Sequence, residues 1–264
     1  MNLEKICEQV VEISRVTGKF IKNELNTFSQ QHIEIKGIHN FVSYVDKTAE
    51  ERIVSALSKV LPKAGFIAEE GTGIPSESGL NWVIDPLDGT TNYIHGLSPF
   101  AISIALMEGE NVILGVVYEI SLDECFWAYT GSDAYLNGKK IHVSNLTTVN
   151  DSLIATGFPY YDYDRMDPLL KSIEYFMRNS HGLRRLGSAA TDLAYVACGR
   201  FEAFYEYGLQ SWDVAEGSII VQQAGGLISD FSGEKNYIFG KEIVASNSNV
   251  YAEFQGVVKN YMVK

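Results

Sequence analysis

Residues 82–92 read Trp-Val-Ile-Asp-Pro-Leu-Asp-Gly-Thr-Thr-Asn. The apolar run ends at Asp85, a second carboxylate follows at Asp88, and Gly89 precedes two threonines. A buried strand that brings two acids to its carboxyl end is suited to a hard cation held through oxygen. The backbone N–H groups at the expected helix start that follows suit an anion such as phosphate. The stretch therefore predicts a cation beside a phosphate, as metal-assisted phosphoryl chemistry requires.

Other interpretations of this stretch are an ordinary turn and two unrelated phosphoryl sites. Pro86, Asp88 and Gly89 are all common turn residues, so a strand followed by a plain turn would look similar. Phosphatases that form an aspartyl-phosphate carry Asp-x-Asp, whereas the spacing here is Asp-x-x-Asp. The chain also lacks a Gly-x-x-x-x-Gly-Lys-Ser/Thr loop. Neither aspartyl-phosphate chemistry nor a nucleotide-hydrolysing motor is therefore favoured.

The composition indicates an acidic globular protein. The chain has 264 residues, 46% of them hydrophobic, which is enough for one large domain or two joined subdomains. Its net charge of −12 argues against direct nucleic-acid binding, which depends on clustered Lys and Arg. The 3 cysteines are widely separated and predict no disulfide framework, which fits a reducing cytosol. The 5 histidines show no zinc-ligand spacing.

Neither a leader peptide nor a membrane span is expected. Over residues 3–26, apolar positions such as Ile6, Val10 and Ile13 are interleaved with charged ones, which is typical of an amphipathic helix. No apolar run approaches the length needed to cross a bilayer. We therefore expect a cytoplasmic protein with no membrane partner.

Helix and strand patterns follow one another along the chain without a long linker or repeat. Residues 100–143 have the period of antiparallel strands, and Asn137-Gly138 is a strong hairpin turn signal. These patterns predict a layered α/β sandwich with one half at residues 1–143 and the other at 144–264. The expected helices span 3–26, 46–61, 165–178, 188–198, 212–224 and 249–261, and the main strands span 66–68, 82–85, 101–107, 112–118, 125–129, 151–156, 183–186, 201–207, 227–230 and 243–246.

Acidic residues also stand at the end of other expected elements. Glu69 and Glu70 follow a short strand, Asp213 begins a helix, and Asp46 closes the extended run from Val42. Taken singly, an acid at a helix start is more often a cap than a ligand, and paired glutamates are more often solvated loop charge. These acids therefore indicate a cation site only when they are considered together.

Four motifs follow one another along the chain: Glu69-Glu70, Asp85-Pro86-Leu87-Asp88-Gly89-Thr90-Thr91-Asn92, Gly187-Ser188-Ala189-Ala190, and Trp212-Asp213-Val214-Ala215 with Ala224-Gly225-Gly226 downstream. Together, in this order, they resemble the inositol monophosphatase family over essentially the whole chain. The resemblance implies an αβαβα fold, a homodimer, and a lithium-sensitive, Mg²⁺-dependent phosphatase.

The resemblance also implies a set of metal ligands, all of them the hard oxygen donors that Mg²⁺ prefers. Glu69, Asp85 and the Leu87 carbonyl would hold one ion, and Asp85, Asp88 and Asp213 a second. A third, loosely held ion would arrive with the phosphate. Glu69 is chosen over Glu70 because the first acid of the pair is the ligand in the family.

The remaining site residues follow from the same resemblance. Thr90, paired with Asp46, would orient or deprotonate the attacking water, and the N–H groups of Gly89 and Thr90 would hold phosphate oxygens. Lys36 matches a lysine near the metals, although a solvated lysine is an equal alternative. The residues expected to meet substrate hydroxyls are Gly187, Ser188, Ala189 and Glu206.

Departures from the family pattern leave the substrate open. Ala68 stands where Gly is more common, Ser188 where Thr is common in animal members, and the segment before Asp46 is not Thr-rich. Inositol 1-phosphate or a similar polyol phosphate is the expected substrate. Alternatives with the same metal site are fructose 1,6-bisphosphate, 3′-phosphoadenosine 5′-phosphate and histidinol phosphate. An alternative of another class is a protein-binding role in transcription or RNA processing.

Overall fold

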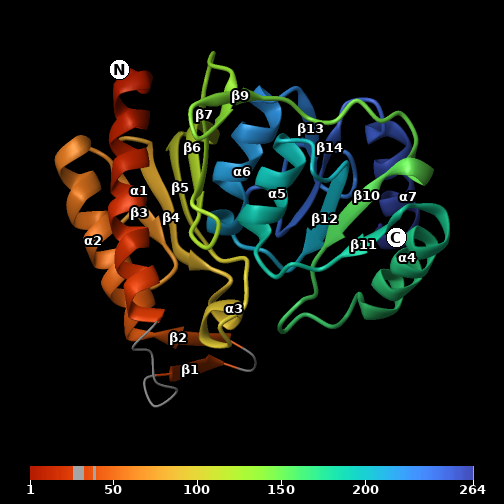
Figure 1. The fold of residues 1–264 in the computed structure, drawn as a ribbon, viewed down its shortest axis with the longest axis horizontal. Coiled ribbons are helices and arrows are strands. Elements are labelled where there is room, and N and C mark those ends of the chain that lie inside the picture. Colours follow the sequence, from red (N-terminus) through yellow and green to blue (C-terminus); the bar gives the residue numbers. More distant parts are fainter. Residues whose placement is uncertain (26–32, 38–39, 264) are drawn as a thin grey trace.

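The computed structural model describes the backbone of residues 1–25, 33–37 and 40–263, and the side chains of 1–25 and 44–263. Helices and sheets stack in the order αβαβα (Figure 1). The helices are α1 (Leu3–Leu25), α2 (Tyr44–Val60), α3 (Thr90–Ile94), α4 (Met166–Asn179), α5 (Ala189–Ala197), α6 (Ser211–Gln223) and α7 (Tyr251–Met262). The strands are β1 (Ile33–Gly37), β2 (Asn40–Ser43), β3 (Gly65–Ala68), β4 (Leu80–Asp88), β5 (Ala101–Glu108), β6 (Asn111–Glu119), β7 (Glu124–Tyr129), β8 (Ala134–Leu136), β9 (Lys139–Ile141), β10 (Leu153–Thr156), β11 (Gly182–Arg184), β12 (Ala203–Tyr207), β13 (Gly226–Ser229) and β14 (Glu242–Asn247).

The larger sheet has seven strands in the order β3-β4-β5-β6-β7-β8-β9. Only β3 and β4 are parallel, and the other neighbours are antiparallel. Helices α1 and α2 cover one face, and α5 and α6 lie on the other (Figure 1). Trp82 and Ile84 therefore pack towards α1 and α2, and Val83 packs towards α5 and α6. Burial on both faces explains the unbroken apolar run before Asp85.

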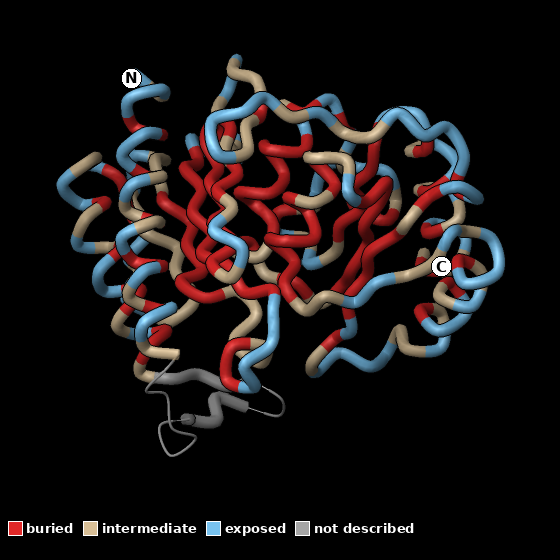
Figure 2. Tube along the Cα trace, in the orientation of Figure 1, coloured by how far each residue is buried: buried red, intermediate tan, exposed pale blue. Residues whose placement is uncertain are grey.

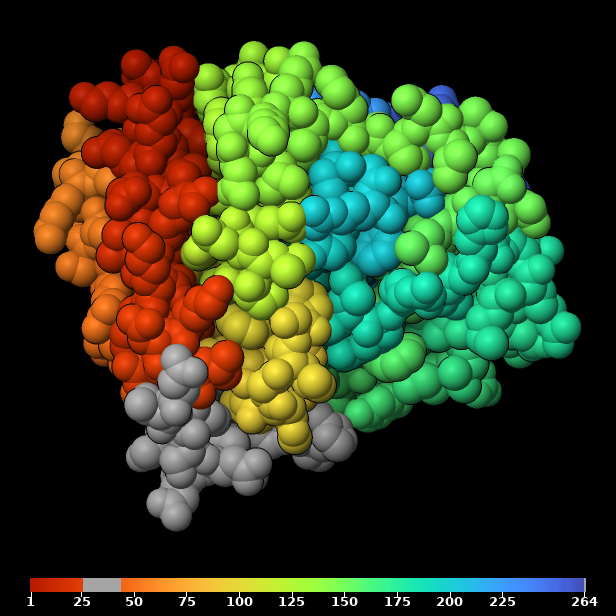
Figure 3. All heavy atoms as spheres, viewed as in Figure 1, coloured from red at the N-terminus to blue at the C-terminus, as the bar shows by residue number. Residues whose placement is uncertain are grey.

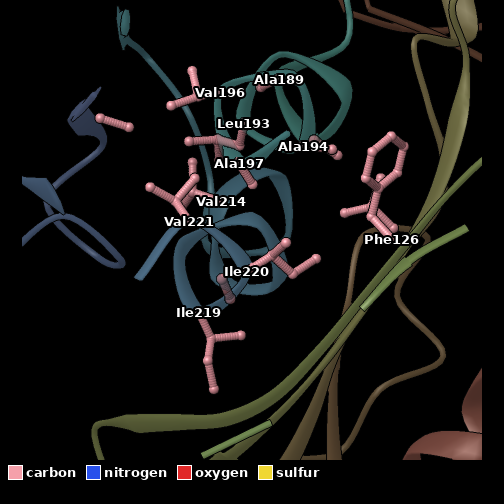
Figure 4. Packing of buried hydrophobic residues seen from close by; sticks show 14 of the residues in the cluster. Phe126, Ala189, Leu193, Ala194, Val196, Ala197, Val214, Ile219, Ile220 and Val221 are labelled. Atoms are coloured by element: carbon pink, nitrogen blue, oxygen red, sulfur yellow. The ribbon is translucent and has the colours of Figure 1, made fainter. Parts of the chain in front are cut away.

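A second sheet has five strands in the order β11-β10-β12-β14-β13, and β1 and β2 form a separate two-stranded antiparallel sheet. Its core strand β12 alternates in the same way, because Phe204 packs towards α5 and α6 while Tyr205 packs towards α4 and α7. The helices α5 and α6 thus form a shared middle layer, and buried residues are concentrated there (Figure 2). Small and branched side chains such as Ala194, Leu193 and Val221 fill this layer (Figure 4).

The two halves of the chain meet along a continuous boundary in the space-filling view (Figure 3). The seven-stranded and five-stranded sheets lie at residues 65–141 and 153–247, and the division at residue 143 stays a prediction. Among the described residues, no helix is both long and apolar enough to cross a membrane.

Most expected elements are confirmed, including the hairpin turn, where Asn137 and Gly138 have φ of 47° and 78°. One placement was wrong. Asp46 does not close an extended run, because β2 ends at Ser43 and α2 begins at Tyr44. The acid lies in the first turn of α2, where the helix dipole favours negative charge.

Candidate active site

Asp85 and Asp88 are brought to one pocket by an irregularity in β4. Residues three apart on a regular strand face opposite sides of the sheet. The pairing of β4 with β5 shifts register between Asp85 and Asp88, so both carboxylates reach the same side. The Leu87 N–H donates to Asp85 Oδ1 at 2.8 Å and holds this turn of the chain. The strand also continues to Asp88, beyond the predicted end at residue 85.

Asp213 joins these two acids from the first turn of α6. Its Oδ2 accepts the Gln210 N–H at 2.6 Å, in a reciprocal cap with the Gln210 side chain. Carboxylate oxygens of Asp85, Asp88 and Asp213 lie within 4.8 Å of one another. The structure therefore places together three of the predicted ligands, which are separated by 128 positions between the first and the last.

The charges of this trio oppose one another. Burial raises the pKa of Asp85 well above its usual range, and Glu69, Asp88 and Asp213 raise it further. Desolvation raises the pKa of Asp88 to about 6, although hydrogen bonds from Ser188 and Ala190 lower it in part. The pKa of Asp213 is raised by desolvation and by Asp88. A divalent cation would relieve this repulsion, and the all-oxygen donor set fits Mg²⁺.

The loop after β3 supplies the next candidate ligand. Glu69 and Leu87 line the pocket that Asp85, Asp88 and Asp213 also line. The Glu70 N–H donates instead to Glu50 Oε2 at 2.7 Å, and Thr72 donates to Glu50 through its N–H and its hydroxyl. Glu50 is fully buried on α2 and positions this loop. The sequence pattern did not identify Glu50, because nothing in its spacing connects it to residues 70–72.

Thr90 and Asp46 meet although 44 positions separate them. The Thr90 hydroxyl lies 3.0 Å from Asp46 Oδ1 and 3.0 Å from the Leu87 carbonyl, the two acceptors for its hydrogen. Gly89 precedes it at φ 91°, and a Cβ there would lie 3.0 Å from the Pro99 carbonyl oxygen. Only glycine is therefore accommodated without strain at the start of α3.

The pocket has a volume of about 390 Å³ and extends from the acids to a wall formed by the second half of the chain. Glu206 lies in this wall on β12, and burial raises its pKa to about 8 while Arg185 opposes the rise. A Cβ at Gly157 would lie 1.9 Å from the Glu206 carboxyl carbon, so the glycine makes room for this side chain. The rest of the wall comes from Gly157, Phe158, Pro159, Tyr160, Tyr161, Arg185 and Tyr207.

Gly187, Ser188 and Ala189 line the pocket, and their contacts with substrate hydroxyls stay a prediction. The Ser188 hydroxyl already makes hydrogen bonds within the protein. Ser188 caps α5, and its Oγ donates to Asp88 Oδ2 at 2.7 Å. The side chain of Lys36 lies outside the described residues, so its role stays a prediction. The aromatic residues that line the pocket, Phe158, Tyr160, Tyr161 and Tyr207, were not predicted from the sequence. The Gly157-Phe158-Pro159 run directly after β10 is a signal that could have indicated them, because glycine at a strand end often marks a close approach.

An αβαβα protein with three carboxylates gathered in one pocket defines a class that could hold a cation through oxygen. The sequence matches the inositol monophosphatase family over residues 2–261. It is 34% identical over 251 residues to an inositol-1-monophosphatase of Mesorhizobium japonicum, covering 95% of this chain and 94% of that one. It is 40% identical over 243 residues to the Nus factor SuhB of Pseudomonas aeruginosa, covering 90% of each.

The fold also matches a solved structure. The inositol monophosphatase of Anabaena (Nostoc) superposes with a TM-score of 0.87 at 30% identity, covering 99% of this chain and 98% of that one. The chain therefore belongs to the inositol monophosphatase family, and the predicted family and layered fold are confirmed. Membership in this family supports a phosphatase.

Proposed function

We propose that this protein is a Mg²⁺-dependent phosphomonoesterase that hydrolyses inositol 1-phosphate or a similar polyol or sugar phosphate. The observation that carries the proposal is the carboxylate trio beside the Thr90–Asp46 hydrogen bond, at the base of one pocket. Glu69, Asp85 and the Leu87 carbonyl are assigned to one ion, and Asp85, Asp88 and Asp213 to another. We expect a third ion to bind with the substrate, and a homodimer in solution.

We assign to the Thr90–Asp46 pair the role of orienting or deprotonating the attacking water. With its hydrogen directed to Asp46, the Thr90 oxygen keeps lone pairs that can accept a hydrogen bond from water. Asp46 is buried behind Thr90 and holds the hydroxyl in that orientation. Bound Mg²⁺ supplies charge neutralisation for the phosphate and activation of the water. The N–H groups of Gly89 and Thr90 are assigned to phosphate oxygens.

We assign to the pocket wall that faces the three carboxylates the role of binding the leaving group. With a pKa of about 8, Glu206 can bind polyol hydroxyls in either form. The protonated carboxyl can donate one hydrogen bond and accept another, and the carboxylate that Arg185 favours can accept hydrogen bonds from two hydroxyls. Fructose 1,6-bisphosphate, 3′-phosphoadenosine 5′-phosphate and histidinol phosphate remain alternatives because they would use the same cation site.

Phosphate release from these four compounds, with Mg²⁺ and with excess EDTA, tests the proposal. We expect Mg²⁺-dependent release from inositol 1-phosphate, with inhibition by lithium. Asp213→Asn should abolish release at low Mg²⁺ and raise the Mg²⁺ concentration required. Release that persists in EDTA would refute the cation-dependent mechanism.

A second candidate role is protein binding in transcription or RNA processing, and its support is the 40% identity to a protein named Nus factor SuhB. An inactive Asp88→Asn variant separates the two roles. If the variant binds purified RNA polymerase as well as the wild type does, the binding role is independent of hydrolysis. Absence of binding by both proteins would remove this candidate.

A further inference from the structure

Glu216 is a carboxylate for which the proposed reaction gives no role. It lies on α6 three residues after Asp213, and residues at this spacing occupy the same side of a helix. Its relative exposure is 0%, and neither of its carboxylate oxygens has a hydrogen-bond partner among the described residues. An unpartnered buried carboxylate is costly, so its presence calls for a compensating group.

The surroundings of Glu216 place it behind the cation ligands. A Cβ on Gly115 of β6 would lie 2.4 Å from the Glu216 carbonyl oxygen, so α6 lies directly on the larger sheet. Ser103 of β5, the register partner of Asp85, donates its Oγ hydrogen to the Trp212 carbonyl at 2.7 Å. Its single hydroxyl hydrogen is used there, so Ser103 makes no hydrogen bond to the nearby Glu216 carboxylate, although its proximity lowers the pKa of Glu216 in part.

We propose that Glu216 is a further carboxylate of the cation centre. It lies behind Asp88 and Asp213, and its negative charge attracts and positions the cation without binding it directly. It is not a direct ligand, because the oxygens within 4.8 Å of one another come from Asp85, Asp88 and Asp213. Glu216 also does not line the pocket. This inference rests on the proposed function, since it requires the cation to bind at that site.

Electrostatic evidence supports this placement. Burial raises the pKa of Glu216, and the Asp88 carboxylate adds to the rise. Glu216 in turn raises the pKa of Asp213. The comparison with Asp192 is informative, because Asp192 is also buried with an unpartnered oxygen but has Arg185 nearby. Ser103 and the backbone N–H groups of Glu216 and Gly217 lower the pKa of Glu216 in part, but the principal groups that shift it include no cationic side chain. A bound cation is therefore the charged group that would favour the carboxylate form of Glu216.

Mg²⁺ binding to the full chain, measured by calorimetry and by tryptophan fluorescence, tests the inference without relying on turnover. Trp212 lines the pocket beside Asp213 and can report binding. Glu216→Gln removes the charge and keeps the shape, Glu216→Met removes both the charge and the polar atoms, and Glu216→Asp retains the charge. The matched control is Glu202→Gln, because Glu202 is buried at the other end of β12 and accepts the Leu153 N–H at 2.6 Å.

We expect Glu216→Gln and Glu216→Met to weaken Mg²⁺ binding roughly tenfold, as the loss of a nearby charge requires. Glu216→Asp should bind within about twofold of the wild type, and Glu202→Gln should match it. Wild-type affinity in both charge-free variants would overturn the role of Glu216 alone. A wild-type protein that binds no Mg²⁺ would overturn the proposed function and this inference with it. If Glu216→Gln does not fold, the Mg²⁺ affinity of Glu216→Met tests the role of Glu216.

Discussion

The two walls of the pocket are held by different kinds of interaction. On the cation side, Asp85, Asp88 and Asp213 each accept a backbone N–H, from Leu87, Ala190 and Gln210 respectively. On the other side, Phe158 and Tyr161 are 45% and 54% exposed. The candidate ligands are therefore fixed by strand and helix ends, whereas the facing wall depends on side chains that can change without breaking backbone bonds. Under the proposed function, the chemistry and the choice of substrate would be carried by separate parts of the fold.

Removing one charge from the cation wall should have the largest effect. We expect Asp88→Asn to lower kcat about a thousandfold or more, which is comparable to the effect of removing a preorganised electrostatic group from an enzyme active site. The fold should survive, because an amide oxygen can still accept from Ser188 and Ala190. Phosphate release and thermal melting measure the two effects. Asp133→Asn, which alters a surface ion pair with Lys140, is the control. Near-normal turnover in Asp88→Asn would refute the ligand assignment.

Thr90→Ala should cause the next largest loss, about a hundredfold or more in kcat, because it removes the hydroxyl paired with Asp46. Thr90→Ser keeps that hydroxyl and should retain most of the activity. The comparison of the two variants at saturating Mg²⁺ gives the measurement. Equal rates in both would show that the hydroxyl does not handle the water.

On the facing wall, Gly157→Ala should change substrate binding more than chemistry. The new Cβ would overlap the Glu206 carboxylate, at 1.9 to 2.0 Å, and would displace it from the pocket. We expect KM for inositol 1-phosphate to rise about tenfold with a smaller change in kcat. Gly256→Ala is the matched control, because open space surrounds Gly256 on α7. An unchanged KM would mean that Glu206 does not bind the leaving group.

The smallest effect concerns pH. The pKa of Asp88 is raised to about 6 and that of Glu206 to about 8, so the folded chain keeps these protons to a higher pH than the unfolded chain. The metal-free protein should therefore lose stability as pH rises from about 4 to 8. Mg²⁺ should offset the part due to Asp88, and we expect the Mg²⁺-induced rise in Tm to be about 2–4 °C larger at pH 8 than at pH 5. A rise that shrinks with pH would contradict this sign.

The fold could be predicted from sequence where local patterns decide the structure. The apolar run before Asp85, the Asn137-Gly138 turn and the Gly225 helix end are local signals, and all lie where expected. Asp46 was misplaced because its extended-looking neighbours join a helix through tertiary packing. Element ends also moved by one to three residues, as in β4.

The candidate site was predicted less from spacing than from resemblance. No local pattern connects Asp213 to Asp85, and their meeting depends on how α6 packs against the larger sheet. Glu50 and the aromatic residues of the facing wall, which are Phe158, Tyr160, Tyr161 and Tyr207, were not assigned a role, because each matters through contacts with distant segments. The pairing of Ser188 with Asp88 likewise required the structure.

That last hydrogen bond has a consequence for motion. Asp88 from the first half also accepts the Ala190 N–H at 2.8 Å, so an expected cation ligand caps a helix of the second half. Local opening of the first turn of α5 must break this bond, and a cation that fixes the Asp88 carboxylate would oppose the opening. The amide of Ala190 should then exchange its hydrogen with solvent more slowly when Mg²⁺ is present. A single backbone proton would thereby report how firmly the two halves of the molecule hold each other.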